Sequence, residues 1–270
     1  MGGAVGTHRR GRCLLRLLTG EALSTRRSRL YPRMLILGIE TATPQVSVAI
    51  GGHEGVIGLF EVLRGRRHAE TLTPALEFVC RQADVDIAEF GAVAVDIGPG
   101  LFTGMRVGLA SAKAIAQALR VPMIGITSLD LLAFPLRHAD RTIAAVIDAR
   151  KGELFYAFYR PVPGGLQRVT EPAVGTCDDL VADLMARNQN VVCVGDGALL
   201  HRDEISGALP CDFAEQFLQH PSAAPLVQLA HARALREEWV NPRDIQPMYL
   251  RAPDAQINWS TRASGSRGAR

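Results

Sequence analysis

The sequence predicts an α/β protein made of two mixed-sheet domains that repeat one order of strands and helices. The main observation is that the order strand–strand–strand–helix–strand–helix can be followed twice along the chain. The length of 270 residues suits two domains, and 47% hydrophobic with 21% charged residues is ordinary globular composition. No apolar run reaches the ~18 residues that a membrane-spanning helix needs, which excludes that class of protein.

The first half opens with three short apolar runs that tight turns connect. They lie at Met34–Glu40, Val46–Ile50 and Val56–Leu63, and their spacing predicts an antiparallel meander. At His68–Ala83 the apolar residues change to helical spacing. The rest of this half is expected to form a strand at Gly91–Ile97, a helix at Phe102–Leu119 and a strand at Val121–Ile126. We assign residues 34–138 to the first domain.

The second half repeats that order without close sequence identity. The expected elements are strands at Thr142–Asp148, Glu153–Arg160, Leu166–Glu171 and Asn190–Gly195, and helices at Cys177–Ala186 and Pro221–Glu238. Two such units in tandem are the outline of the duplicated actin/hsp70/sugar-kinase (ASKHA) architecture. We assign residues 139–251 to the second domain. Its last helix, at 221–238, either stays in that domain or packs back on the first.

The two ends of the chain differ from the part between them. Residues 1–33 carry eight arginines and one acidic residue, Glu21, whereas residues 34–260 carry a net charge of −7. The leader has three interpretations: a transit-like targeting peptide, a basic nucleic-acid arm, or translation from an upstream start with Met34 as the true first residue. We favour the third, because a complete strand begins at Met34. We expect the leader and residues 252–270 to be disordered.

The charge and the cysteines limit the function classes. The acidic body argues against a main nucleic-acid surface on the folded part, because phosphate contacts need clustered Lys or Arg. Five scattered cysteines without a C-x-x-C pair are typical of reduced thiols. We therefore expect a cytoplasmic protein.

A glycine-rich segment, Gly98–Gly104, follows a strand and opens a helix. The backbone N–H groups of a helix N-terminus favour anions, and Thr103 is suited to cap the helix. A tight strand-to-helix turn is an equally good interpretation, and the segment is neither a P-loop nor a G-x-G-x-x-G motif. In this architecture the first hairpin also addresses phosphates, which makes ATP or ADP a candidate ligand. The candidate nucleotide or phosphate residues are Glu40, Thr41, Thr43, Gly98, Pro99, Gly100 and Thr103.

The helix that follows carries a stripe of small residues four apart: Gly104, Gly108, Ala112 and Ala116. Glycine inside a helix costs about 1 kcal/mol against alanine, so the stripe indicates close approach of another backbone. That backbone belongs either to this protein's own sheet or to a partner helix. On the second interpretation, Gly108→Leu weakens a partner complex and leaves the monomer folded. The candidate interface residues are Leu72, Leu76, Val79, Gly104, Met105, Gly108, Leu109 and Ala112.

No catalytic residue can be assigned from the motifs. The seven histidines never occur as H-x-x-x-H, H-x-H or H-E-x-x-H, and no G-x-S-x-G elbow is present. A transition-metal site would need residues from remote parts of the chain.

Five segments together resemble the TsaB (YeaZ) family of proteins of bacterial tRNA threonylcarbamoyladenosine (t6A) modification. They are Ile36–Thr43, Gly98–Leu109, Ile124–Leu129, Ile147–Glu153 and Pro247–Arg251, in family order. The second segment, Gly-Pro-Gly-x-Phe-Thr-Gly-x-Arg-x-Gly-Leu, is the most specific. The resemblance covers about residues 34–251, and the arginine-rich leader departs from the family pattern.

The resemblance implies a non-catalytic partner subunit. The paralogous catalytic subunit TsaD holds a metal on an H-x-x-x-H pair, and the two ligand positions fall here on Ser128 and Leu132, so no metal is expected. Members of the family dimerise with TsaD through the two N-domain helices and activate threonylcarbamoyl transfer to N6 of adenosine 37 in tRNAs reading ANN codons. The complex also recruits TsaE, and tRNA is contacted through the complex. The alternatives are a stand-alone enzyme of this architecture, either a phosphotransferase or a glycoprotease-like peptidase, and a homodimer that binds a nucleotide.

Overall fold

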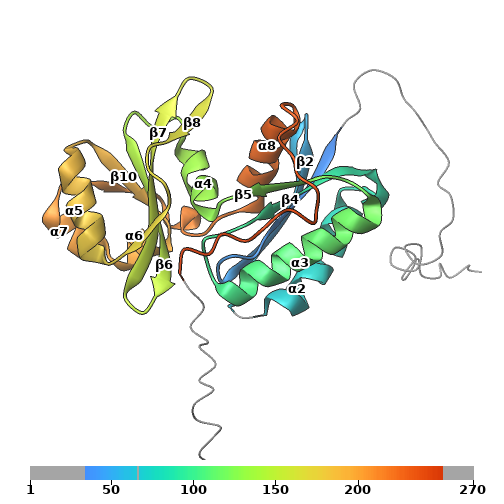
Figure 1. Ribbon diagram of the computed structural model, residues 1–270, viewed down its shortest axis with the longest axis horizontal. Coiled ribbons are helices and arrows are strands. Elements are labelled where there is room, and N and C mark those ends of the chain that lie inside the picture. The colour runs from blue at the N-terminus through green and yellow to red at the C-terminus, as the bar shows by residue number, and fades with distance from the viewer. Residues whose placement is uncertain (1–33, 66, 252–270) are drawn as a thin grey trace, which may run out of the picture.

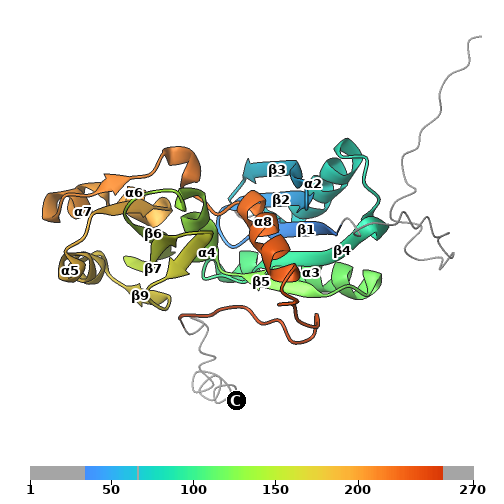
Figure 2. The ribbon, with the colours of Figure 1, turned by 90° about the horizontal axis from the view of Figure 1, so that it is seen from above.

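The structure, a computed structural model, describes residues 34–65 and 67–251 and consists of two lobes that lie side by side (Figure 1). Each lobe is a mixed β-sheet with helices on both faces (Figure 2). The predictions for the leader at 1–33 and the tail at 252–270 lie outside the described residues.

The first lobe is built on a five-stranded sheet of order β3-β2-β1-β4-β5. Strands β1, β2 and β3 form the expected antiparallel meander, and β4 and β5 continue the sheet in parallel. Its elements are β1 Leu35–Glu40, β2 Gln45–Gly52, β3 Gly55–Leu63, α2 His68–Gln82, the short 3₁₀ helix η1 Ile87–Glu89, β4 Phe90–Asp96, α3 Phe102–Leu119 and β5 Met123–Ile126.

The second lobe has a six-stranded sheet in which β11-β10-β6-β7-β8 lie side by side and β9 pairs with β7. Its strands are β6 Thr142–Arg150, β7 Glu153–Val162, β8 Gly165–Arg168, β9 Ala173–Gly175, β10 Val191–Val194 and β11 Asp212–Phe213. Its helices and the helices at its borders are α4 Ser128–Ala133, η2 Phe134–Leu136, α5 Cys177–Arg187, α6 Asp196–Leu200, α7 Arg202–Ala208, η3 Gln216–Leu218 and α8 Ala223–Ala234.

The two sheets have one topology. Strand β1 pairs antiparallel with β2 and parallel with β4, and β6 likewise pairs antiparallel with β7 and parallel with β10. With β9 set aside, β1, β2, β3, β4 and β5 therefore correspond to β6, β7, β8, β10 and β11. This repeat confirms the duplicated ASKHA-type α/β fold expected from the sequence.

Helices cover both faces of each sheet (Figures 1 and 2). In the first lobe α2 and α3 bury one face and α8 the other, which gives two apolar clusters on opposite sides of β1. In the second lobe α4 covers one face, and α5, α6 and α7 cover the other. Helix α4 contributes to both lobes, because Leu131 packs with α8 while Leu129 and Leu132 pack on the second sheet. This short helix therefore joins the two cores.

The C-terminal part of the described chain returns to the first lobe. Helix α8 packs on β1 and β2, Val240 forms an antiparallel bridge with Met123, and the Met248 N–H donates to the Ile97 carbonyl at 2.7 Å. The helix ends at Ala234 rather than at residue 238, and turns follow it.

Several elements differ from the sequence expectation. The third strand of the second lobe ends at Arg168, and β9 follows as a separate strand. Helices α4, α6 and α7 were not expected from the sequence, because five to seven residues are too few for a clear helical period. None of the helices within 34–65 and 67–251 is long and apolar enough to span a membrane.

Candidate functional site

Acidic side chains lie at the carboxyl ends of neighbouring parallel strands in both lobes. Glu40 ends β1 and Asp96 ends the adjacent β4. In the second lobe Asp148 lies near the end of β6, and Asp196 follows β10. In open α/β sheets this edge is where ligands bind. The repeat of the fold therefore places a pair of carboxyl groups at equivalent edges of the two sheets.

The first pair, Glu40 and Asp96, is completely buried. The Ala42 N–H donates to Glu40 Oε1 at 2.7 Å, and Asp96 Oδ1 accepts from the Gly98 N–H at 2.7 Å and the Ser128 hydroxyl at 2.8 Å. The other two oxygens, Glu40 Oε2 and Asp96 Oδ2, have no hydrogen-bond partner among the described residues. Burial, and then the charge of Asp96, raise the pKa of Glu40 well above its usual value. Burial raises the pKa of Asp96 to about 7.

The second pair lies at the β6–β7 hairpin. The Asp148 N–H donates to Asp196 Oδ1 at 3.1 Å, and Arg150 pairs with Asp148 at 2.9 Å. Burial raises the pKa of Asp196 to about 6. Burial also lowers the pKa of His220, whose Nδ1 lies 3.9 Å from Asp196 Oδ2. Both sheets thus hold a carboxyl group that takes up a proton more readily than an exposed acid.

The raised pKa of Asp96 predicts a pH-dependent stability. Between about pH 4 and pH 7 the Asp96 carboxyl group keeps its proton in the folded state but has lost it in the unfolded state. The free energy of unfolding therefore falls as pH rises through this range. Asp96→Asn removes the ionisation. Relative to the unsubstituted protein, the free energy of unfolding of this variant should rise by a few kcal/mol between about pH 5 and pH 8, measured by urea denaturation.

Asp179→Asn is the control for this measurement. Hydrogen bonds from Thr176 lower the pKa of Asp179, so this carboxylate is ionised in both states over the tested range. The difference between this variant and the unsubstituted protein should not change with pH. A pH-independent difference for Asp96→Asn would contradict a buried proton at Asp96.

The glycine-rich segment packs tightly against the first hairpin. Gly98 has a φ of +96°, and its peptide bond to Pro99 is cis. A Cβ at Gly100 would overlap the Ala42 carbonyl oxygen, and the Leu101 N–H donates to that oxygen at 2.6 Å. The glycines thus allow this segment to lie close to the protein's own first hairpin, as the tight-turn interpretation expects.

The candidate phosphate residues do not form one surface in this structure. Glu40, Thr41 and Thr43 are at most 2% exposed, and Gly98 and Pro99 are also buried. The Thr41 hydroxyl donates to the Gly104 carbonyl at 2.8 Å, and the Thr43 carbonyl accepts from His68 Nε2 at 2.7 Å. Thr103 is exposed, and helix α3 begins after Leu101 without a side-chain cap, so Thr103 does not cap it. A bound phosphate could not reach the hairpin residues without moving them.

A cavity of about 460 Å³ lies beside this segment, between the start of α3, the β6–β7 hairpin and the C-terminal segment. Of the candidate phosphate residues, Gly100 lines it. The cavity also has three arginines, each with a partner. Arg106 donates to the Tyr249 hydroxyl, Arg150 pairs with Asp148, and Arg251 pairs with Glu153. The cavity is large enough for a small ligand, and its cations are already engaged by the protein.

The small-residue stripe of α3 faces the protein's own sheet. Gly104, Gly108 and Ala112 are buried, and a Cβ at either glycine would overlap Thr41. Met105, Leu109, Leu72 and Val79 are buried in the same lobe, and Leu76 is partly buried against its core. The buried members of this set therefore pack within the protein itself, as the interpretation of close approach to its own sheet expects, and a partner interface at these residues stays a prediction.

The two positions at which the family resemblance places the metal ligands of the catalytic subunit are occupied by side chains that pack or bond internally. Ser128 begins α4, is completely buried and donates to Asp96. Leu132 lies one turn later, is 2% exposed and packs in the core of the second lobe. An isobutyl side chain has no ligand atom.

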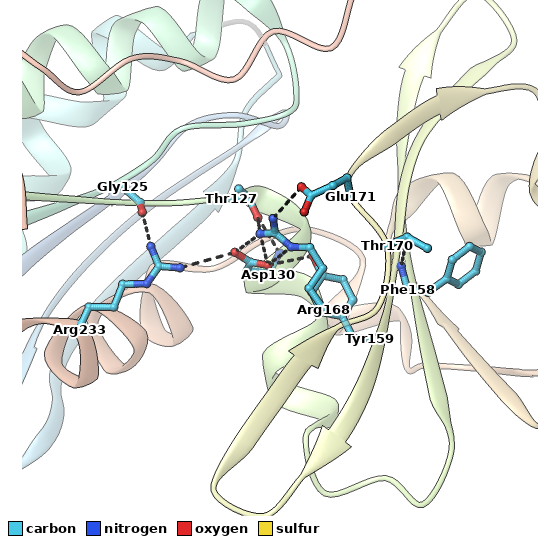
Figure 3. Close-up of polar contacts among 9 residues, drawn as sticks. All are labelled: Gly125, Thr127, Asp130, Phe158, Tyr159, Arg168, Thr170, Glu171 and Arg233. Carbon is cyan, nitrogen blue, oxygen red and sulfur yellow. Dashed lines mark hydrogen bonds and ion pairs between the residues drawn. The ribbon is translucent and has the colours of Figure 1, made fainter. Parts of the chain in front are cut away.

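A polar cluster centred on Asp130 joins the two lobes (Figure 3). Asp130, on α4, accepts from Arg168 Nη2 at 2.7 Å and from the Tyr159 hydroxyl at 2.9 Å, both in the second lobe. Arg233, on α8 of the first lobe, lies 3.9 Å from Asp130 Oδ2 and donates to the Gly125 carbonyl at 2.8 Å. Sequence reasoning missed this cluster. The available signal was a single acid among the three leucines of α4.

Comparisons with known proteins agree with this fold and with the sequence motifs. The family model of TsaD, described as tRNA N6-adenosine threonylcarbamoyltransferase, matches residues 58–259. The chain is similar to "tRNA threonylcarbamoyladenosine biosynthesis protein TsaB" of Escherichia coli, with 30% identity over 81% of this chain and 95% of that protein. It is 27% identical to the protein of the same name from Bacillus subtilis, over 84% of this chain and 98% of that one.

A solved structure from Pseudomonas aeruginosa, described as an uncharacterized protein with similarity to peptidase YEAZ, also matches. It has a TM-score of 0.70 and 26% identity, and the match covers 81% of this chain and 100% of that chain. The matches confirm the resemblance that the sequence motifs indicated.

Proposed function

The chain belongs to the TsaB (YeaZ) family, and on that premise we propose that it is the non-catalytic partner that dimerises with TsaD and activates it. The reaction is transfer of threonylcarbamoyl to N6 of adenosine 37 in tRNAs that read ANN codons. It takes place in the cytoplasm, within a larger complex that includes TsaE. The observation that carries the proposal is the match to named TsaB proteins along most of the chain.

The absence of catalysis by this chain alone is supported by the two positions that align with the metal ligands of TsaD. Ser128 donates its hydroxyl to Asp96, and Leu132 is packed in an apolar core. Neither side chain replaces an imidazole, which is the ligand type that the catalytic subunit uses there. Burial raises the pKa values of both Glu40 and Asp96, which favours their neutral forms. This pair therefore does not replace the metal site of the catalytic subunit as a strongly charged binding site for a cation.

The outer surface of α2 and α3 is the proposed docking face for TsaD. These helices lie next to each other on the side of the first sheet away from α8 (Figure 1). The outward side of α3 carries a second row of small residues four apart, distinct from the buried glycine stripe. This ridge is formed by Ala110, Ala114 and Ala118, which are all exposed. Phe78 of α2 is 43% exposed. A ridge without long side chains lets a partner helix approach closely, and an exposed aromatic adds apolar area.

The tRNA is contacted mainly through the other subunits. The net charge of residues 34–260 is −7, which opposes a phosphate-binding role for most of this surface.

Ala114→Arg tests the docking face. The long cationic side chain should prevent close helix approach and weaken binding to TsaD of the same organism at least about tenfold, or about 1.4 kcal/mol. Calorimetry with the two purified proteins measures this change. The monomer should melt like the unsubstituted protein, because Ala114 is exposed.

Ala182→Arg is the matched control, since Ala182 is also an exposed alanine within a helix, α5, but lies in the other lobe. It should bind TsaD normally. Unchanged affinity for Ala114→Arg would exclude this face, and no binding between the unsubstituted proteins would overturn the proposed function itself.

Assays on the purified chain distinguish a stand-alone enzyme from the proposed non-catalytic subunit. ATP turnover or peptide cleavage with added divalent metal ions would contradict the proposed non-catalytic role. Calorimetry with ATP and with ADP, in the presence and absence of TsaD, tests the homodimer that binds a nucleotide.

A further inference from the structure

Three side chains with good metal-ligand atoms converge on the outer side of the second lobe. They are Cys177, His201 and Glu204, and their ligand atoms all lie within 4.8 Å of one another. In the residues that the structure describes, no other set of three or more His, Cys, Asp and Glu side chains meets this condition. The sequence motifs did not indicate this set, because the cysteine is 24 residues away from the histidine.

The positions of the three residues are set by helix ends that are themselves anchored. Cys177 is the first residue of α5, whose N-cap Thr176 forms a capping box with Asp179. His201 is the junction between α6 and α7, and its carbonyl accepts from the Ile205 N–H at 3.0 Å. Ile205 is completely buried in the apolar cluster that α5 shares with α7. The ligand backbones are therefore held by the fold rather than by a loose loop.

The three side chains differ in exposure in a way that suits an ion entering from solvent. Cys177 is 7% exposed, the His201 side chain 18% and the Glu204 side chain 63%. The thiol thus forms the floor of the site, and the carboxylate lies at its mouth. His201 Nδ1 and Glu204 Oε2 are already 2.9 Å apart.

The separations between ligand atoms, 2.9 Å for the histidine and the carboxylate and at most 4.8 Å within the set, bracket those of a tetrahedral centre. Zinc binds sulfur at about 2.3 Å and nitrogen or oxygen at about 2.0–2.1 Å, so ligand atoms on one ion are separated by about 3.3–3.7 Å. The atoms here lie within 4.8 Å of one another. Side-chain movements of about 1 Å, within the range of ordinary rotamer adjustment, would bring all three onto one ion.

We propose that Cys177, His201 and Glu204 form a binding site for a borderline-soft divalent transition-metal ion, with Zn²⁺ as the best fit. Thiolate and imidazole ligands favour zinc over Mg²⁺ and Ca²⁺, which prefer oxygen. The protein supplies three ligands and solvent supplies the fourth. Binding releases the thiol proton to solvent. The ion would tie the N-terminus of α5 to the start of α7, at a distance from the docking face on α2 and α3.

Metal binding to the full chain tests this proposal directly. After chelator treatment, Zn²⁺ titrated by calorimetry should bind with a stoichiometry of one at this site and should raise the melting temperature. Co²⁺ in place of Zn²⁺ should produce a sulfur-to-cobalt charge-transfer band, which reports the thiolate ligand in the unsubstituted protein. A missing band would overturn the site whether or not any variant folds.

Variants then assign the ligands. Cys177→Ser, His201→Ala and Glu204→Gln should each weaken Zn²⁺ binding, the first two by at least about 10–100-fold, since even partners of the ligands have effects of that size. Cys211→Ser is the matched control, because this partly exposed cysteine is outside the cluster, and it should bind normally. Circular dichroism without metal shows whether each variant is folded. Equal Zn²⁺ affinity in the folded Cys177→Ser protein would overturn the proposal.

Discussion

Gly108→Leu should destabilise the monomer itself, by about 3 kcal/mol, rather than only weaken a complex. A Cβ at Gly108 would overlap the Thr41 hydroxyl oxygen, which is buried and donates to the Gly104 carbonyl at 2.8 Å. Ile39 and Thr41 carbon atoms lie 3.5–3.6 Å from the same position, so the remaining atoms of a leucine have no free space. The helix would have to move away from β1.

The size of this effect follows from three contributions. Overpacking of a close-packed core costs about 1–3 kcal/mol, and the loss of the Thr41 hydrogen bond with its donor still buried costs about 1–3 kcal/mol. Leucine is a better helix former than glycine by nearly 1 kcal/mol, which offsets part of the loss. For a folded body of this size, about 3 kcal/mol lowers the melting temperature by roughly 6–12 °C.

Ala110→Leu, on the exposed side of the same helix, is the control and should melt close to the unsubstituted protein. Thermal denaturation followed by circular dichroism measures both variants. If Gly108→Leu melted like the control, the packing of α3 on β1 would be contradicted and an outward position of the stripe would again be open.

The comparison of the two sides of α3 shows what the sequence could predict. Small residues four apart indicated that a backbone approaches closely, and the structure confirms that approach at Gly104 and Gly108. The pattern does not tell which backbone it is, because sheet and partner helix make the same demand for a small side chain. The outward ridge at Ala110 and Ala114 carries no comparable signal, since alanine is also the commonest choice for an exposed helix.

The strands and long helices were predictable for a simple physical reason. Buried strands such as β1 and β4 are continuous apolar runs, and α3 matches its expected range of Phe102–Leu119. The duplicated order of these elements was enough for the fold. The sequence pattern does not predict which residues far apart in the chain come together. Asp96 with Glu40, and Cys177 with His201, meet only after the sheets form.

Short segments at the border of the lobes were the hardest to predict. Helix α4 has six residues, and its Leu129, Leu131 and Leu132 serve two different cores, so no single apolar face is visible. Asp130 is the charged residue of this helix. Because its partners come from β7, β8 and α8, its role could not be deduced from local sequence.

Asp130→Ala should therefore lower stability and loosen the connection between the lobes. The substitution leaves the Arg168 guanidinium, whose side chain is 27% exposed, with the more distant and exposed Glu171 carboxylate at 3.6 Å in place of Asp130, and the buried Tyr159 hydroxyl without its acceptor. Breaking a buried ion pair costs about 3–5 kcal/mol, and the partial exposure of Arg168 places the expected loss near the lower limit. We expect the melting temperature to fall by roughly 6–12 °C. Calorimetry should also show a broader transition if the lobes no longer unfold together.

A double-substitution cycle separates the ion pair from general damage. Asp130→Ala combined with Arg168→Met removes both charges, so the double variant should be more stable than the sum of the two single losses predicts. Asp140→Ala is the control, because Asp140 also pairs with an arginine, Arg141, but its side chain is 87% exposed. Solvent screens that pair, and its loss should leave the melting temperature nearly unchanged. Additive losses for Asp130 and Arg168 would contradict a coupled cluster, because a partly buried charge left without its main partner is the reason that each single change is costly.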